Sequence, residues 1–315
     1  MTTNLRALLT GRNSRQGLWF IPLLIGCLGS AWLAVRTDEF LNAQNLLNLV
    51  AQATPLMIVS LGQMIVVLVR GLDLSVGAVI SLTTAILALD APAYVLLPAV
   101  FLATGLIGFV NGFAVARLNV HPIIATLSMM MIVQGVTMLV RPVAGGTIPP
   151  LVIHLVTGEF LGVYMPVIWS LVIILVGWKL IHGSRYGLHL FAIGGAEDVA
   201  RSFGIADKRS ILLAYVACST FGALAGLFLA GRIASGDPNI GMPFALDSVT
   251  AVALGGTQLA GGVGSLHGTV IGAFLMALLA NGMNVENVSA FVQTAVKGTI
   301  LLLVVALQPR KFMGL

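Results

Sequence analysis

Charged residues are scarce in this sequence, at 9% of its 315 residues. Soluble domains carry about 25% charged residues, whereas here 58% of the residues are hydrophobic and the mean hydropathy is +1.03. These values exclude a soluble domain and place the chain in a lipid bilayer. Its apolar runs are too long for the alternating strands of a membrane barrel, which predicts an all-α, polytopic bundle of membrane helices. The net charge of +5 does not indicate a nucleic-acid partner, because the basic residues form no cluster on a water-soluble segment.

Cysteine and the motifs of catalysis are equally scarce. Cys27 and Cys218 each lie within an apolar run, which predicts buried free thiols rather than a disulfide or a metal site. The sequence contains no G-x-x-x-x-G-K-S/T phosphate loop, no H-E-x-x-H pair and no Ser/His/Asp arrangement. It also lacks the arginine series of a voltage sensor and a TVGYG filter. We therefore expect no catalytic residue, no metal and no cofactor in this chain.

Long apolar runs predict about ten membrane spans in one transmembrane domain over residues 1–315, with about 20 residues for each crossing. The first run resembles a signal peptide, but no small-residue cleavage site follows it cleanly, so we interpret it as a retained span. The eighth span is the weakest, because Asp247 and five glycines from Gly255 to Gly264 interrupt it. The predicted spans are 18–35, 48–69, 74–90, 93–116, 122–140, 166–181, 210–231, 244–262, 265–283 and 289–308.

The basic residues indicate the orientation of these spans. With ten crossings and a cytoplasmic N-terminus at 1–17, twelve lysines and arginines fall inside and three fall outside, which is a strong positive-inside bias. We therefore predict that both termini are cytoplasmic, that 182–209 is a cytoplasmic loop, and that 141–165 is an extracellular cap or short surface helix. The inside positions are Arg6, Arg12, Arg15, Arg70, Arg117, Lys179, Arg185, Arg201, Lys208, Arg209, Arg310 and Lys311, and the outside positions are Arg36, Arg141 and Arg232.

An acidic residue between two apolar runs marks the first candidate site, GLDLSVG at 71–77. A carboxylate is expensive in lipid and should face protein or a water-filled path. Its flanking glycines permit irregular backbone, which survives at membrane depth only where it is buried or lines a cavity. Two interpretations of Asp73 stay open: it contacts substrate, or it caps a helix that begins near Leu74 and pairs with Arg70. The charge pattern places it close to the cytoplasmic turn, which favours the cap. The residues assigned to a translocation path or its gating are Gly71, Asp73, Ser75 and Gly77.

A second acidic residue accompanies a similar break. Asp247 is predicted to begin an apolar half-helix whose end is broken by glycines, and this half-helix is a second candidate for lining a path. Further along, three glycines recur at four-residue spacing, which is typical of faces where membrane helices pack closely. The residues assigned to the path or its gating are Asp247, Thr250, Gly255 and Gly256, and those assigned to helix packing are Gly264, Gly268 and Gly272.

A weak internal repeat accompanies the two breaks. Asp73 lies 38 residues before the pair Asn111-Gly112, and Asp247 lies 34 residues before Asn281-Gly282. In the predicted topology spans 2–5 begin outside and spans 7–10 begin inside. Two such units would be inverted relative to each other, as in many transporters. Coincidence is the open alternative.

The cytoplasmic loop contains a polar segment that predicts a short helix near 195–204. Glu197 and Asp198 lie in its first turn, Gly195 precedes it and Gly204 closes it, an order that the helix dipole and the C-cap both favour. Such a helix is either a solvated connector or a docking site for a soluble partner. Its caps and its place at the middle of the chain favour docking.

Three ordered motifs carry a family resemblance: GLDLSVG at 71–77, AIGGAEDVARSFGI at 192–205 and DSVTAVALGGTQLAGGVGSLHGT at 247–269. Together they resemble the ribose/xylose/galactose-type permeases of bacterial ABC importers, in the branched-chain amino acid/ribose permease superfamily. The resemblance runs from about residue 45 to the last span. In that family the loop matching 192–205 looks like the coupling helix that seats in a groove of the ATPase; here Ala196 stands where Asn is usual. The coupling residues that the resemblance implies are Gly194, Gly195, Glu197, Ala200, Arg201 and Gly204.

The resemblance implies a permease subunit, without ATPase activity of its own, in the bacterial cytoplasmic (inner) membrane. Two such subunits, identical or sibling, would pair. Each would rest on a cytoplasmic ATP-binding subunit that holds Mg-ATP, and a periplasmic or lipid-anchored binding protein would deliver a monosaccharide. The alternatives are a permease for branched-chain amino acids or autoinducer-2, and an ion-coupled secondary carrier acting alone. A membrane-embedded enzyme would need a catalytic constellation that the sequence lacks.

Overall fold

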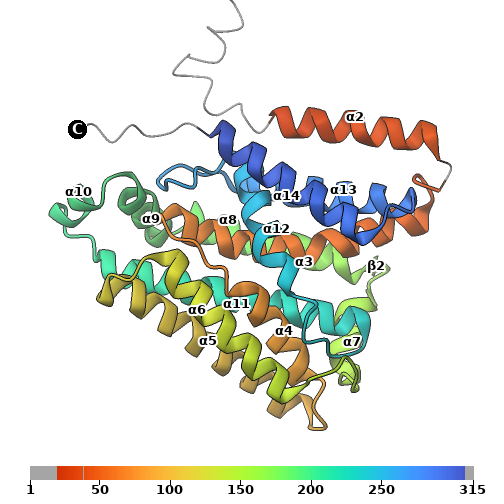
Figure 1. The fold of residues 1–315 in the computed structure, drawn as a ribbon, viewed down its shortest axis with the longest axis horizontal. Coiled ribbons are helices and arrows are strands. Elements are labelled where there is room, and N and C mark those ends of the chain that lie inside the picture. Colours follow the sequence, from red (N-terminus) through yellow and green to blue (C-terminus); the bar gives the residue numbers. More distant parts are fainter. Residues whose placement is uncertain (1–19, 38, 309–315) are drawn as a thin grey trace, which may run out of the picture.

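Helices make up most of the computed structural model, which describes residues 20–37 and 39–308 (Figure 1). One short hairpin, β1 (Glu159–Phe160) with β2 (Val163–Tyr164), is the only sheet in that part of the chain. The helices are α2 (Phe20–Arg36), α3 (Ala43–Leu68), α4 (Val76–Leu87), α5 (Ala93–Leu118), α6 (Pro122–Val140), α7 (Pro150–Thr157), α8 (Met165–Ile181), α9 (Arg185–Gly195), α10 (Glu197–Ser202), α11 (Asp207–Ile233), α12 (Met242–Leu254), α13 (Leu266–Val285) and α14 (Ala290–Leu307).

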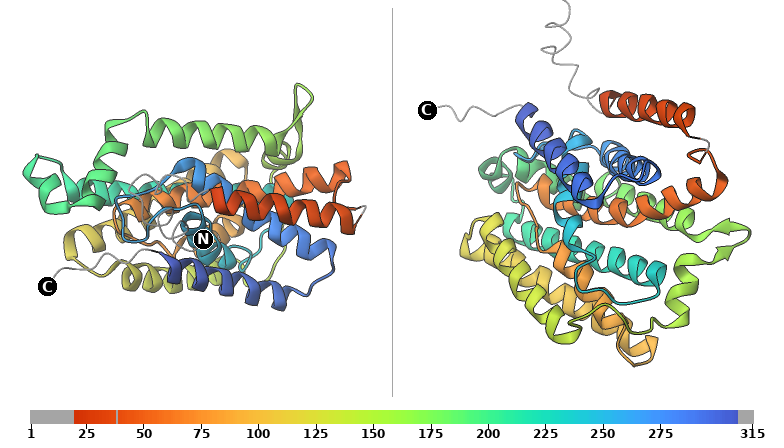
Figure 2. Two further views of the ribbon diagram at one scale, coloured as in Figure 1. Left: turned by 90° about the horizontal axis from the view of Figure 1, so that it is seen from above. Right: turned by 45° about the vertical axis from the view of Figure 1, so that its right-hand side comes forward.

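These helices form a polytopic membrane bundle. Among the described residues, six helices are long and apolar enough to cross a membrane, or seven if the bent pair α8 and α9 counts as one crossing. α4 and α12 are also apolar but shorter, at 12 and 13 residues. Helix α10 and the β1–β2 hairpin lie at opposite ends of the bundle (Figures 1 and 2). The two longest loops, predicted to lie on opposite sides of the membrane, are therefore separated by the length of the helices.

The eighth predicted span, 244–262, is wrong at its end, because α12 stops at Leu254. The chain beyond it turns through Gly256, Gly261 and Gly262, whose φ angles are 81°, 80° and 73°. Glycine adopts this left-handed region without the strain that a side chain would impose. The glycines therefore end the helix and build an irregular loop up to α13.

The two cysteines differ in their surroundings. Both are free thiols, but Cys27 is exposed on α2 whereas Cys218 is buried, so the prediction of burial is wrong for Cys27. An exposed thiol on a membrane helix can face lipid at little cost, because a free cysteine behaves as a small hydrophobe. The basic residues before position 20 and after position 308, which entered the charge count, lie outside the described residues.

Helices α3 and α11 form the centre of the bundle and run side by side. In the most apolar window of α3, 89% of the residues are buried, against 28% in α5 and 17% in α6. The two central helices approach closely at Gly62, where a Cβ would lie 2.7 Å from Phe221 Cβ. The surrounding helices expose large apolar side chains such as Leu106 and Leu139. This is the distribution expected of a bundle whose solvent is lipid.

The two central helices each begin a unit of the same order. α3 is followed by α4, α5 and α6, and α11 is followed by α12, α13 and α14, with a short second helix in both units. Each central helix packs against the other unit, α3 on α12 and α13, and α11 on α4 and α5. The short helices meet at Gly77 and Gly241, where a Cβ on Gly77 would lie 2.9 Å from the carbonyl oxygen of Gly241.

The breaks before α4 and α12 share a local geometry. Arg70 and Ala234 have φ angles of 64° and 52°, and each is followed three residues later by an aspartate. Asp73 Oδ1 accepts the N–H two residues further on at 2.9 Å, and Asp237 Oδ1 does the same at 2.8 Å. The same separation of 164 residues relates Arg70 to Ala234 and Asp73 to Asp237. The structural counterpart of Asp73 is therefore Asp237.

The predicted correspondence of Asp73 with Asp247 is accordingly wrong. Asp247 does not begin a half-helix but lies inside α12, five residues after Met242. The sequence pattern was misleading because each aspartate precedes an apolar run. Whether the aspartate caps that run depends on where the preceding helix ends.

Gly241→Ala tests the crossing of α4 and α12. A Cβ at this position would collide with the carbonyl oxygen of Gly77, and overpacking of this kind costs about 1–3 kcal/mol. We expect the detergent-purified chain to unfold at a lower temperature. Gly105→Ala in α5 is the control, since nothing lies within 4 Å of its Cβ position, and it should not lower Tm. Equal Tm values for the two variants would contradict the crossing.

Candidate functional site

The first break in the bundle is organised by the side chain of Asp73, which is fully buried. Its Oδ1 accepts the Ser75 N–H at 2.9 Å and the Ser75 hydroxyl at 2.6 Å. The Ser75 hydroxyl in turn accepts from Asn111 Nδ2 on α5 at 2.9 Å. α4 begins directly afterwards at Val76. Asp73 therefore organises the entry into α4, but the helix begins two residues later than predicted, and Ser75 rather than Asp73 occupies the N-cap position.

Gln63 on α3 holds the backbone of the same residue. With its amide nitrogen facing the carbonyl of Asp73, the side chain donates to Asp73 O at 3.0 Å and accepts from Asp73 N at 3.1 Å. Thr126 Oγ1 on α6 donates to the neighbouring carbonyl of Leu72 at 3.2 Å. Side chains from two helices, α3 and α6, thus satisfy a piece of backbone that no regular helix satisfies, as burial requires.

Two polar atoms beside the break have no hydrogen-bond partner. They are Asp73 Oδ2 and Tyr215 Oη, both buried. Gly71 packs against the second of them, since a Cβ at Gly71 would lie 2.5 Å from Tyr215 Oη. Buried polar atoms without partners are costly, so this part of the break is less completely satisfied than the backbone held by Gln63.

The break lies inside the bundle rather than at its surface turn. Tyr215 is eight residues into α11, about 12 Å from the start of that helix at 1.5 Å per residue. Asn111 lies seven residues before the end of α5 at Leu118, a similar depth. The expectation that the stretch lies close to the turn therefore needs correction: the chain re-enters the bundle after α3.

Arg70 does not pair with Asp73, contrary to one sequence-based interpretation. Its Nε donates to the carbonyl of Gly194 at 2.9 Å and its Nη2 to that of Gly195 at 3.0 Å. These carbonyls end α9, so the guanidinium satisfies acceptors that the helix leaves free. The arginine connects the first break to the segment that leads into α10.

The loop after α12 meets the same place. The Gly262 N–H donates to the carbonyl of Leu68, the last residue of α3, at 3.0 Å. A side chain at Gly194 would collide with both of these groups, and one at Gly261 would collide with Arg70. We call the contact of Leu68–Arg70, Gly194–Gly195 and Gly261–Gly262 the junction. Its three segments lie within, or directly beside, the three motifs that carry the family resemblance.

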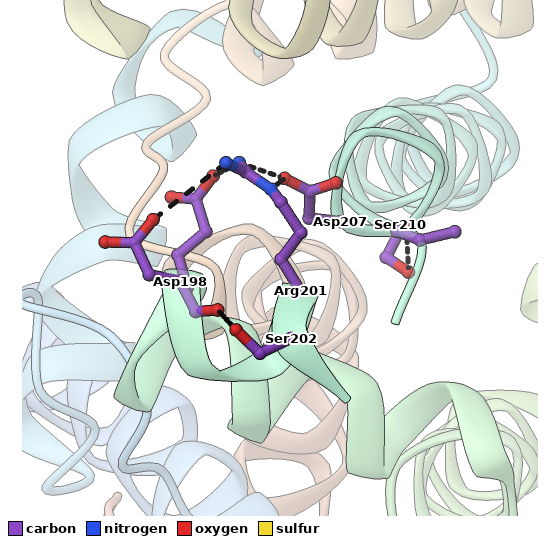
Figure 3. A network of polar contacts seen from close by, with 7 residues as sticks. Asp198, Arg201, Ser202, Asp207 and Ser210 are labelled. Carbon is purple, nitrogen blue, oxygen red and sulfur yellow. Dashed lines mark hydrogen bonds and ion pairs between the residues drawn. The ribbon is translucent and has the colours of Figure 1, made fainter. Parts of the chain in front are cut away.

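Helix α10 projects from the junction and is held by an ion-pair network (Figure 3). Arg201 lies within 3.1 Å of Glu197 Oε1, and its Nε donates to Asp207 Oδ2 at 3.0 Å. The hydrogen bond and charge of Asp207, the first residue of α11, raise the pKa of Arg201, so the guanidinium stays protonated. Ala200 is buried beneath the network. Gly204, at φ 79°, turns the chain towards α11.

The outward side of α10 carries residues that sequence inspection missed. Phe203 is 83% exposed and Val199 is 54% exposed, although both are apolar and lie outside the helices long enough to span a membrane. The sequence does contain a signal for this pair, because two large apolar residues occur at four-residue spacing in an otherwise polar segment. An exposed apolar pair on a firmly held short helix is typical of a docking surface.

The residues of the second break are dispersed. Asp247 forms an ion pair with Lys297 on α14, Nζ to Oδ2 at 2.6 Å, and Lys297 is another residue that the sequence assignment omitted. Thr250 is buried and donates to its own helix, to Leu246 O. Gly255 packs against the backbone of α13, where a side chain would collide with Gly268.

The three glycines assigned to packing lie in two different settings. Gly268 and Gly272 face the backbone of α12, and a side chain at either would collide with a carbonyl oxygen, that of Gly255 or Ala251. Gly264 precedes α13 and lies beside Leu68. Only the first two therefore belong to a helix face.

A cavity of about 360 Å³ lies between the first break and α10. Gly71 and Tyr215 line it on the side of the break, and Glu197 and Arg201 line it on the side of α10. The described residues contain no group of three or more side chains that could hold a metal ion. The junction thus links the projecting helix α10 to the first break and to the loop after α12, and the cavity lies beside this link.

Comparison with known sequences identifies relatives over most of the chain. The family described as branched-chain amino acid transport system / permease component matches residues 45–305. The ribose import permease protein RbsC of Escherichia coli is 35% identical over 290 residues, which cover 89% of this chain and 90% of that protein. RbsC of Bacillus subtilis is 33% identical, with 89% of both chains covered. The galactose/methyl galactoside import permease protein MglC of Haemophilus influenzae is 30% identical, with 95% of both covered. No solved structure matches the chain. The predicted family resemblance is confirmed.

Asp73→Ala tests the first break. It removes the acceptor for the Ser75 N–H and hydroxyl, and a buried donor left unsatisfied costs about 1–3 kcal/mol. We expect a lower Tm and reduced transport without a change in substrate preference. Asp73→Asn keeps an oxygen in the Oδ1 position and should be the milder variant. Wild-type Tm and transport in Asp73→Ala would show that the carboxylate does not organise the break.

Proposed function

This chain belongs to the family described as branched-chain amino acid transport system permease components, and we propose that it is the membrane-spanning permease subunit of an ATP-driven importer for a ribose-type monosaccharide. Relatives named as ribose, galactose and allose permeases support the sugar class. The scarcity of charge supports a neutral substrate, because a path for ions or zwitterions needs matching charges or dipoles. ATP is hydrolysed by a partner, since this sequence has no phosphate loop.

The observation that carries the proposal is the junction. Arg70 joins the first break to the end of α9, and Gly262 joins the loop after α12 to the end of α3. A displacement of α10 is therefore passed to the first break and to the loop after α12 through direct hydrogen bonds. A secondary carrier that acts alone has no soluble partner, so it would not need a projecting helix that is held in this way.

The mechanism follows from these contacts. ATP binding closes the partner ATPases, which move α10 through its exposed face. The junction transmits this movement to the segments at 71–77 and 255–264, and the path opens alternately to the two sides. Glycines at the junction allow the backbones to slide in contact, because no side chain lies between them.

We further propose the topology that the sequence indicates: ten spans, both termini in the cytoplasm and two inverted units, α3–α6 and α11–α14. The 164-residue separation of the two breaks and the crossing of α4 with α12 support the repeat. The assembly lies in the bacterial inner membrane. It contains a second permease subunit, an ATP-binding subunit on the cytoplasmic side of each α10, and a periplasmic or lipid-anchored sugar-binding protein. A branched-chain amino acid is the rival substrate, because it appears in the description of the family.

The substrate is tested by a thermal-shift screen of the cognate binding protein, followed by uptake into vesicles that contain the whole transporter. We expect a ribose-type sugar to stabilise the binding protein and to be imported in the presence of ATP. Stabilisation and import of leucine, isoleucine or valine without any sugar would refute the sugar assignment.

Arg201→Gln tests coupling. Loss of its contacts with Glu197 and Asp207 frees α10 from α11, so the complex should still hydrolyse ATP while sugar uptake falls about ten-fold, roughly 1.4 kcal/mol in the coupled step. Arg209→Gln is the control, because it removes an equal charge from an exposed position near the start of α11. Uptake and hydrolysis that fall in parallel in both variants would exclude a specific coupling role for α10.

A further inference from the structure

An ion pair lies near the middle of two apolar helices. Lys297 is seven residues after the start of α14 and ten before its end, so it lies about 10–15 Å from either end of the helix. Its Nζ is 2.6 Å from Asp247 Oδ2 on α12. Charges at this depth are costly in lipid, and they face a protein interior or water.

This chain alone does not enclose the pair. The side chain of Lys297 is 24% exposed and that of Asp247 is 13% exposed, and α14 contains no buried residue at all. Hydrocarbon in contact with the open side would face two charges. The open side of α12 and α14 must therefore be covered by something polar.

A second polar contact lies just before α12, where the loop that leads into it meets α6. Gln134 Nε2 on α6 donates to Asn239 Oδ1 at 3.2 Å, and Gln134 Oε1 is buried without a partner. Between the two contacts α12 exposes Pro243 and Leu246. In Figure 1 α12 crosses in front of the bundle, with α14 on one side and α4 and α6 on the other.

We propose that the open side of α12, between α6 and α14, is a wall of the sugar path, and that Asp247 and Lys297 bind the hydroxyl groups of a neutral sugar there. This inference rests on the proposed function and deepens it. A hydroxyl group both donates and accepts, so it can donate to the carboxylate and accept from the ammonium group at the same time. The pair has no net charge and does not select for an ion.

The neighbouring residues of α14 fit the assignment. Thr294 and Gly298 are exposed on the turns next to Lys297, whereas the later part of the helix exposes Leu302 and Leu303. Thr294 is three residues from Lys297, so the two residues share a face of α14 and Thr294 extends the polar surface beside the ion pair. The opposite wall belongs to the second permease subunit of the proposed assembly.

Cysteine labelling tests whether this side is wet. In a Cys27→Ser background, Thr294→Cys and Gly298→Cys are treated with a charged, water-soluble methanethiosulfonate in vesicles that contain the whole transporter. Leu106→Cys is the control, because it is 63% exposed near the middle of α5 and should face lipid, where the thiolate that reacts does not form. We expect labelling at 294 and 298 at least about ten-fold faster than at 106, and a change in rate when ribose and ATP are added. Labelling at 294 and 298 as slow as at 106 would overturn the inference.

Neutralising the pair tests its contact with sugar. Asp247→Asn and Lys297→Gln each leave one charge unpaired, so both should lower assembly as well as uptake. The double variant Asp247→Asn/Lys297→Gln leaves no charge and should assemble, with a Tm close to that of the wild type, yet its KM for uptake should rise about ten-fold. A double variant with wild-type KM and kcat would mean that the pair only joins α12 to α14.

The two proposals fail in different ways. If the wild-type transporter imports no sugar but the cysteine variants at 294 and 298 are labelled rapidly, the sugar assignment is refuted, and the proposed sugar contact is refuted with it. If the wild type takes up ribose normally but the cysteine variants are unreactive, only the proposed sugar contact at Asp247 and Lys297 is refuted.

Discussion

Backbone groups that are released where a helix stops inside a membrane must be satisfied within the protein, and this constraint organises the bundle. The segments that follow α3 and α11 both re-enter the bundle before the next helix begins. Gln63 holds the N–H and carbonyl of Asp73, and Thr84 holds the N–H and carbonyl of Asp237 at 3.1 and 3.0 Å. One side chain on a neighbouring helix thus satisfies two backbone groups at each break. The short helices α4 and α12 can begin only because of these contacts.

Each break is also tied to a loop at its own end of the bundle. At one end Arg70 donates to the last carbonyls of α9. At the other end Arg141 Nη2 donates to the carbonyl of Ala88 at 2.6 Å, and Gly145 and Gly236 exchange backbone hydrogen bonds at 2.9 and 3.0 Å. An arginine that reaches carbonyl groups therefore closes both ends. Such contacts are geometrically specific, but their acceptors are neutral carbonyl groups. Breaking them therefore leaves no carboxylate without a partner.

The contrast between the two ends lies in what projects from them. α10 carries an ion-pair network and an exposed apolar pair, whereas α7 packs its Val152 and Val156 into the bundle. In the proposed assembly the first arrangement presents a surface to the ATP-binding subunit, whereas α7 packs against the bundle at the opposite end. In the same proposal, the polar contacts of α12 provide groups that bind a neutral sugar. Transport in this scheme needs no titrating residue in the path, because the energy enters through α10.

Much of the architecture could be read from the chain itself. The apolar runs, the acidic start and glycine end of α10, and the three motifs depend on local composition and on spacing along the sequence, so they identified the bundle, the short helix and the family. The predictions that were wrong depend on distant partners: the eighth span was extended to residue 262 although α12 ends at Leu254, Cys27 was expected to be buried, and Asp73 was matched with Asp247 instead of Asp237.

The sequence by itself determined that this protein is a helical membrane bundle of the permease family, because hydrophobicity and motif order are properties of the chain. Only the tertiary structure decided what the polar residues do. Arg70 meets Gly194 across 124 residues, and Asp247 meets Lys297 across 50. In a bundle with so few charges, each polar group is satisfied by whichever helix packing brings near, and no local pattern encodes that choice.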